Sequence, residues 1–118
     1  MSKYNHANMK PKKLIRNGNY TERFKEHLEN ITDKDELNKL YILKIKEELQ
    51  EIIDSDFKDI YEFVDLLDVC DAFREQNFSR DEFGVASRKK LLDRGFFGTL
   101  VLTDLNPENP SNKVYFEE

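Results

Sequence analysis

Apolar residues recur at helical spacing along the middle of the chain. Steps of three and four residues define one series, which comprises Leu37, Leu40, Tyr41, Ile45, Leu49 and Ile52. Positions with this spacing form one stripe along a helix. Thr32 precedes the series and resembles the start of a capping box in which Asp35 replaces Glu. Because no Gly or Pro occurs before Asp54, the pattern predicts a helix between Thr32 and Asp54.

The next stretch, from Phe57 to about Glu75, is apolar on almost every side. Its apolar positions are Ile60, Tyr61, Phe63, Val64, Leu66, Leu67, Val69, Cys70, Ala72 and Phe73. A helix of this kind is expected at the centre of a bundle. Asp56 is the expected N-cap, so that the residues just after Asp54 connect the two helices as a short hairpin.

Two further helices are predicted, from Thr21 to about Glu29 and from Ser79 to Gly95, the latter with a capping box at its start and a glycine at its end. Residues 96–102 are expected to form a short strand or an extended arm, and from Asn106 the composition is typical of a loop. The predicted fold class is therefore all-α, a four-helix bundle with a short extended C-terminal segment.

Length and composition narrow the possible functions. The 118 residues suit one domain, which we place at 13–105 between a leader, 1–12, and a tail, 106–118. The mean hydropathy of -0.77 is that of a very polar chain, but nine Phe supply enough apolar surface for a core. With a net charge of -5, we expect no duplex nucleic acid partner and no anionic membrane surface.

The single cysteine, Cys70, excludes a disulfide framework and a thiolate metal cluster. No apolar run has the roughly 18 residues of a membrane helix, and the N-terminus lacks the apolar stretch of a signal peptide. We therefore expect a cytoplasmic protein.

The candidate chemistry lies in two acidic motifs, one on each helix of the hairpin. Glu47-Glu48-x-x-Glu51 precedes the turn and Glu62-x-x-Asp65 follows it. At about 100° per residue, Glu48 falls within the apolar stripe, Glu51 at its rim and Glu47 nearly opposite. Two of the three glutamates in the first motif are thus expected to face inward, and Glu47 is expected in solvent.

The register of the hairpin brings these motifs together. In an antiparallel pair, residues at one height have sequence numbers with a constant sum, and the pairs Glu48–Asp65 and Glu51–Glu62 share one sum. Carboxylates crowded in this way require a cation. Oxygen-only ligands favour Mg²⁺, with Mn²⁺ as an alternative. The competing interpretation is a solvated acidic face.

Basic residues supply candidate phosphate contacts. Lys90 and Arg94 lie four residues apart on one predicted helix face, where they would grip pyrophosphate. Lys and Arg near a helix C-terminus also interact favourably with the helix dipole, which is the alternative interpretation. Lys13 and Arg16 form a second candidate pair.

The two acidic motifs around a short hairpin resemble those of the all-α nucleotide pyrophosphohydrolases, the MazG-like and phosphoribosyl-ATP pyrophosphohydrolase-like superfamily. Residues 13–16 resemble the Lys-Leu-Val-Arg opening of one branch, residues 61–69 its Glu-Glu-Leu-Ala-Asp-Val-Leu-Glu-Val stretch, and residues 89–96 its basic segment closing in Arg-Gly-Gly-Phe. The sequence departs from the branch at residues 17–20, where Asp-Lys-Ile-Pro is usual, and at Phe96, which replaces the second Gly of that closing motif.

The resemblance implies Mg²⁺-dependent hydrolysis of a nucleoside triphosphate, or a related nucleotide, to the monophosphate and pyrophosphate. By position, Glu48, Glu51, Glu62 and Asp65 would bind the metal, and Glu48 or Glu51 would also act as the base. The family's oligomers, and the small core of four short helices, lead us to expect a homodimer or homotetramer. The alternative function is a non-catalytic all-α interaction module that docks a basic partner on its acidic face.

Overall fold

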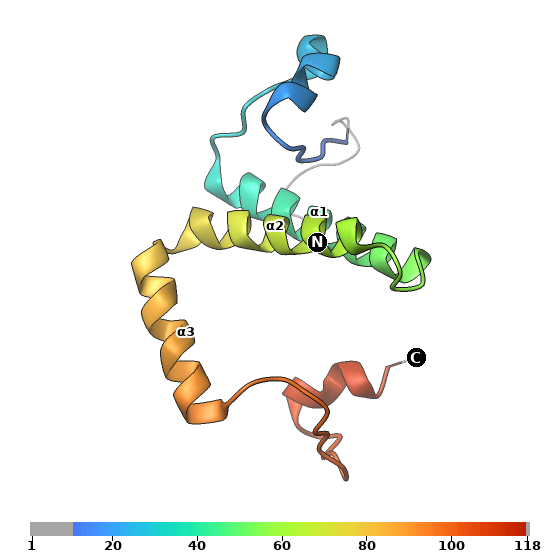
Figure 1. Cartoon of the computed structure of the whole chain (residues 1–118), viewed down its shortest axis with the longest axis vertical. Coiled ribbons are helices and arrows are strands. Elements are labelled where there is room, and N and C mark those ends of the chain that lie inside the picture. The colour runs from blue at the N-terminus through green and yellow to red at the C-terminus, as the bar shows by residue number, and fades with distance from the viewer. Residues whose placement is uncertain (1–10, 118) are drawn as a thin grey trace. The chain divides into compact units, whose positions relative to one another are not determined.

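The chain is all-α over residues 11–117, the part that the computed structural model describes, and this part contains no strand. Its helical elements are η2 (Asn19–His27), α1 (Lys34–Asp54), α2 (Ile60–Asn77), α3 (Arg80–Arg94) and η3 (Pro110–Tyr115), where η denotes a 3-10 helix (Figure 1). The residues divide into two compact units, one that ends at Arg80 and one that begins at Asp81. None of the described helices is long and apolar enough to cross a membrane.

The first unit is built on the hairpin of α1 and α2, which pack against each other and run side by side in Figure 1. Helix α1 begins one residue later than predicted, because the cap is Asp33 rather than Thr32. The Asp33 carboxylate accepts a hydrogen bond from the backbone N–H of Glu36 at 3.1 Å. Since a carboxylate also complements the positive end of the helix dipole, it is at least as good a cap as the neighbouring threonine.

The turn between α1 and α2 differs from the prediction. Asp56 and Phe57 both have left-handed backbone conformations, with φ of 58° and 63°, so Asp56 is not an N-cap and Phe57 is not helical. The N–H of Phe57 returns to the carbonyl of Ile52 at 3.1 Å, which closes the end of α1 in the manner of a helix C-cap. Helix α2 starts at Ile60, and Asp59 caps it by accepting from the N–H of Tyr61 at 2.9 Å.

The core of the first unit is small. Leu40 and Ile52 are its buried apolar residues among those described, and no residue of α2 is buried. The two helices nevertheless stack Tyr41 on Phe73, with ring centroids 5.3 Å apart. The all-α class is thus confirmed, whereas the central position of α2 in a four-helix bundle stays a prediction.

The segment before α1 belongs to the same unit. The helix predicted from Thr21 to about Glu29 is present as the 3-10 helix η2, where Tyr20 and Phe24 form an edge-to-face pair at 5.2 Å. Residues 11–18 precede it without regular structure. Their basic side chains reach α1 and α2, as described below.

The second unit contains α3 and the C-terminal segment. As predicted, α3 starts directly after Ser79, and Gly95 follows it in the left-handed conformation, with φ of 77°. No strand forms at residues 96–102. The loop expected from Asn106 is wrong in part, because η3 occupies Pro110–Tyr115. Proline suits the first position of a helix, and the side chain of Asn109 caps this one through the N–H of Ser111.

Candidate metal centre

Four carboxylates meet between α1 and α2. Each of Glu48, Glu51, Glu62 and Asp65 offers one oxygen, and these four oxygens all lie within 4.8 Å of one another. Helix α1 carries Glu48 and Glu51, and α2 carries Glu62 and Asp65. The convergence predicted from the hairpin register is confirmed.

Glu48 occupies a position where the sequence pattern expects an apolar side chain. It shares the buried stripe of α1 with Leu40 and Ile52 and is only 4% exposed. Its Oε2 atom is buried without a hydrogen-bond partner, and so is the Oε2 atom of Glu62. A buried polar atom without a partner costs about 1 to 3 kcal/mol, and more when it is charged. Either oxygen could be satisfied by a cation, a proton or a water molecule, and the crowding of four carboxylates favours the cation.

Crowding shifts the titration of two members of the cluster. The pKa of Glu51 is raised, first by its contact with the Glu62 carboxyl group, with which it can share a proton, and then by burial. The pKa of Glu48 is also raised. Here burial is the main cause, the Glu51 charge adds to it, and the ammonium group of Lys44 opposes it. Both shifts follow from burial and from the close approach of neighbouring carboxyl groups.

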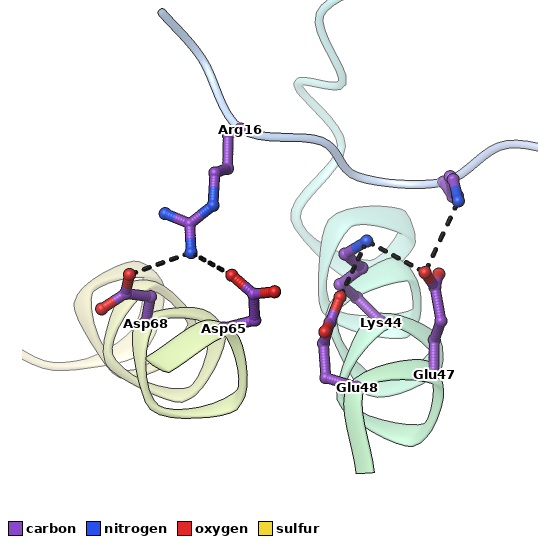
Figure 2. A network of polar contacts seen from close by, with 7 residues as sticks. Arg16, Lys44, Glu47, Glu48, Asp65 and Asp68 are labelled. Atoms are coloured by element: carbon purple, nitrogen blue, oxygen red, sulfur yellow. Dashed lines mark hydrogen bonds and ion pairs between the residues drawn. The ribbon is translucent and has the colours of Figure 1, made fainter. Parts of the chain in front are cut away.

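Lys44 lies at the edge of the cluster, one helical turn before Glu48. Its Nζ is 3.1 Å from Oε1 of Glu48 and 3.3 Å from Oε2 of Glu47 (Figure 2). Burial lowers the pKa of Lys44, but the hydrogen bonds to Glu48 and Glu47 outweigh it and leave the pKa raised. The ammonium group thus stays charged and neutralises part of the acidic site.

We expected Glu47 to lie in solvent, but its side chain is half-buried and paired. Besides Lys44, it accepts a hydrogen bond from Nζ of Lys13 at 3.5 Å. Burial alone would raise the pKa of Glu47, but the two ammonium groups lower it. The prediction from helical angle was wrong because it took no account of the basic N-terminal segment.

Arg16 reaches from that segment to α2. Its Nη2 atom donates to Oδ1 of Asp65 at 2.6 Å and to Oδ2 of Asp68 at 3.0 Å (Figure 2). These two hydrogen bonds, in that order, raise the pKa of Arg16. Lys12 pairs in a similar way with Glu29 and Glu36. The basic residues that precede η2 therefore contact acidic residues of the hairpin, and Arg16 contacts the cluster itself.

The donor set suits a hard divalent cation. Mg²⁺ binds oxygens at about 2.0 to 2.1 Å, so ligands on opposite sides of one ion lie about 4.2 Å apart. The separations within the cluster, up to 4.8 Å, are close to that span. All four donors are carboxylates, which favours Mg²⁺ or Mn²⁺ over zinc. The site residues fit the metal that the sequence predicted.

The remaining predicted phosphate contacts lie in the second unit. Lys90 and Arg94 line a shallow hollow on α3 together with Ala86, Lys89 and Asp93. Their predicted spacing on one face of the helix is present, and their role stays a prediction.

Sequence reasoning missed two residues of the site. Lys44 carries a usable signal, because a lysine four residues before a buried glutamate lies on the same helix face. The second is Asp68, which accepts from Arg16 beside Asp65. No local pattern predicts that contact, since the two residues are 52 positions apart.

Comparison with known proteins finds no matching family model, no similar curated protein and no similar solved structure. What is shown is a small all-α protein in which clustered carboxylates of two adjacent helices can hold a metal ion.

Proposed function

We propose that this protein is a Mg²⁺-dependent hydrolase that cleaves a nucleoside triphosphate, or a related nucleotide, to the monophosphate and pyrophosphate. The observation that carries the proposal is the cluster of four carboxylates in which the Oε2 atoms of Glu48 and Glu62 are buried without partners. The resemblance of both acidic motifs to the MazG-like pyrophosphohydrolases supports the choice of reaction.

The residues supply what phosphoanhydride hydrolysis needs. Bound Mg²⁺ would neutralise phosphate oxygens and polarise the attacking water. Glu48, Glu51, Glu62 and Asp65 would hold the ion. Either Glu48 or Glu51 would accept the proton of the water. No nucleophilic side chain is required.

Cations beside the carboxylates contribute to phosphate binding in this proposal. Arg16 forms an ion pair with Asp65, and Lys13 forms one with Glu47. Both cations are therefore held at the margin of the cluster. Their position in the same unit makes them the better supported pair. Lys90 and Arg94 remain candidates for the pyrophosphate group.

We further propose that the protein works as a homodimer or homotetramer. Helix α2 exposes large apolar side chains that no part of its own unit covers. Ile60 is 71% exposed and Leu67 is 67% exposed. A second copy that packs against this helix would remove apolar surface from water at about 25 cal/mol per Å².

The test is product identification with a panel of ribo- and deoxynucleoside triphosphates in the presence of Mg²⁺ or Mn²⁺. Monophosphate and pyrophosphate are the expected products, and EDTA should stop their release. Diphosphate and inorganic phosphate would show that another bond is cleaved. If neither pyrophosphate nor any other product forms with either metal, the proposed activity is wrong.

One observation favours a second candidate, a module that docks a basic partner. The acidic hairpin already binds the chain's own basic segment, through Lys12, Lys13 and Arg16. A basic peptide in trans would use the same carboxylates. In that case the protein would bind a lysine- and arginine-rich peptide with strong salt dependence, and Mn²⁺ would bind no more tightly than to an ordinary acidic surface.

A further inference from the structure

We infer that Lys44 is a positioning residue that fixes Glu48 so that its Oε2 atom is presented to the metal. The inference rests on the proposed metal centre and deepens it. Lys44 itself would touch neither the metal nor the substrate in this arrangement. It acts on Glu48, the most deeply buried carboxylate of the cluster.

The geometry divides the two oxygens of Glu48 between two tasks. Oε1 is 3.1 Å from Nζ of Lys44. Oε2 is buried and has no hydrogen-bond partner. A carboxylate bound through one oxygen has its rotamer fixed, and the other oxygen is then directed by that contact. By binding Oε1, the ammonium group of Lys44 therefore leaves Oε2 directed toward the cluster.

Lys44 is itself held in place. Its side chain is only 15% exposed, and Nζ also contacts Oε2 of Glu47 at 3.3 Å. Glu47 in turn accepts from Lys13 at 3.5 Å. Alternating charges thus run from the N-terminal segment along α1 to Glu48, as Figure 2 shows for Glu47, Lys44 and Glu48. A row of this kind restrains every member, whereas an exposed single pair would not.

The electrostatics explain why Glu48 needs such a restraint. An oxygen from each of three other carboxylates lies within 4.8 Å of an oxygen of Glu48. Their repulsion would turn the Glu48 side chain away from the site. The Lys44 ammonium group offsets this repulsion from the outer side. Without it, Glu48 loses both its anchor and its nearest positive charge, and the metal loses a preformed ligand. Outer residues that orient metal ligands typically contribute about 10- to 100-fold in affinity.

The test is Mn²⁺ affinity of the full chain, measured by electron paramagnetic resonance and by calorimetry. Lys44→Met keeps the length of the side chain and removes its charge. We expect it to weaken Mn²⁺ binding about 10- to 100-fold. Lys44→Arg keeps the charge and should recover most of the affinity. Lys46→Met is the matched control, since Lys46 is an exposed lysine of the same helix, and it should change the affinity less than about twofold.

Turnover separates positioning from a direct catalytic role. If Lys44 acts through metal affinity, the Lys44→Met protein should regain most of its turnover at saturating Mn²⁺. A turnover that stays low at saturating metal would overturn the inference, because Lys44 would then act on the substrate or on the reaction itself. Circular dichroism of each variant shows whether the helices are intact.

Glu47→Gln provides a second variant if Lys44→Met does not fold. It removes the charge that holds Lys44 while leaving Glu48 unchanged, and a smaller loss of affinity, about threefold, is expected from the weakened anchor. Wild-type protein that binds no Mn²⁺ would refute the proposed metal centre. Wild-type protein that binds Mn²⁺ as tightly as the folded Lys44 and Glu47 variants would refute the positioning role alone.

Discussion

The two faces of the α1–α2 hairpin each depart from the usual distribution of residues. The face between the helices buries a glutamate, Glu48, which is 4% exposed. The outer surface of α2 exposes Ile60 at 71% and Leu67 at 67%. Folded domains normally bury apolar side chains and keep charges in water. The hairpin therefore has an inner face suited to a cation and an outer face suited to another apolar surface.

This contrast leads us to expect that the proposed metal and a second copy would stabilise the hairpin. Buried carboxylates oppose folding unless a cation neutralises them, and a core based on Leu40 and Ile52 contributes little. The proposed metal and the proposed second copy would both bind the folded state and so stabilise it by mass action. Five predictions test the contrast, from the largest expected effect to the smallest.

The first concerns the inner face. Glu51→Gln should reduce pyrophosphate release by at least about 10³-fold, about 4 kcal/mol of transition-state stabilisation, because a metal ligand and a candidate base are lost together. The fold should survive, since a neutral side chain relieves repulsion at this position. The initial rate of pyrophosphate release is the measurement. Glu26→Gln, in the exposed part of η2, is the control and should leave the rate unchanged.

The second compares neighbouring isoleucines on the two sides of α1. Ile52 is 3% exposed, and Ile53 is 48% exposed. Ile52→Ala should lower the free energy of unfolding by about 2 to 5 kcal/mol, whereas Ile53→Ala should lower it by less than about 1 kcal/mol. Urea denaturation of both variants measures the difference. Equal losses would mean that the outer side of α1 is covered as well as the inner side.

The third addresses the outer face of α2. Leu67→Ser should shift the protein toward monomer, because it places a hydroxyl group within the proposed interface between copies. Light scattering after size-exclusion chromatography gives the mass at several concentrations. Lys58→Ser, at the exposed turn, serves as the control. A wild-type chain that is monomeric at high concentration would contradict the proposed assembly.

The fourth uses pH to test the crowding of acids. Because the pKa values of Glu48 and Glu51 are raised in the folded state, their contribution to stability is present at pH values below their unfolded pKa and is lost as pH rises through the folded pKa. The melting temperature in EDTA should therefore fall with rising pH by more in the wild type than in Glu51→Gln. Saturating Mg²⁺ should reduce that difference. Identical pH profiles in EDTA would show that the acids do not interact.

The smallest effect is expected for Arg16→Gln. The Arg16 pairs with Asp65 and Asp68 are largely exposed, so the free energy of unfolding should fall by no more than about 1 kcal/mol. The loss should be local instead, with faster amide exchange at residues 11–17 than in the wild type. Lys25→Gln, which loses only a pair within η2, should leave that exchange unchanged.

The parts of the structure that follow from local chemistry were predictable from the sequence. The apolar stripe from Leu37 to Ile52 predicted α1. The constant sum of the sequence numbers of facing residues predicted that Glu48 and Glu51 lie beside Asp65 and Glu62. These predictions rest on the fixed geometry of helices, which does not depend on distant contacts.

The errors concern conformations and contacts that no local periodicity encodes. Phe57 in a left-handed conformation is unusual for a bulky residue, so the start of α2 was placed three residues early. The central position of α2 in a bundle stays a prediction, because its composition shows how apolar the helix is but not what covers it. Arg16 and Lys13 reach acids far along the chain, and such pairs require the tertiary fold.

The left-handed pair at Asp56 and Phe57 fixes how many residues separate the two acidic motifs, and this makes the connection sensitive to its length. A left-handed backbone strains any residue other than glycine, and a β-branched residue most of all. Valine or isoleucine at Asp56 or Phe57 would therefore disfavour the turn, whereas glycine would fit it without strain. The connection is thus selective for residue type as well as for length.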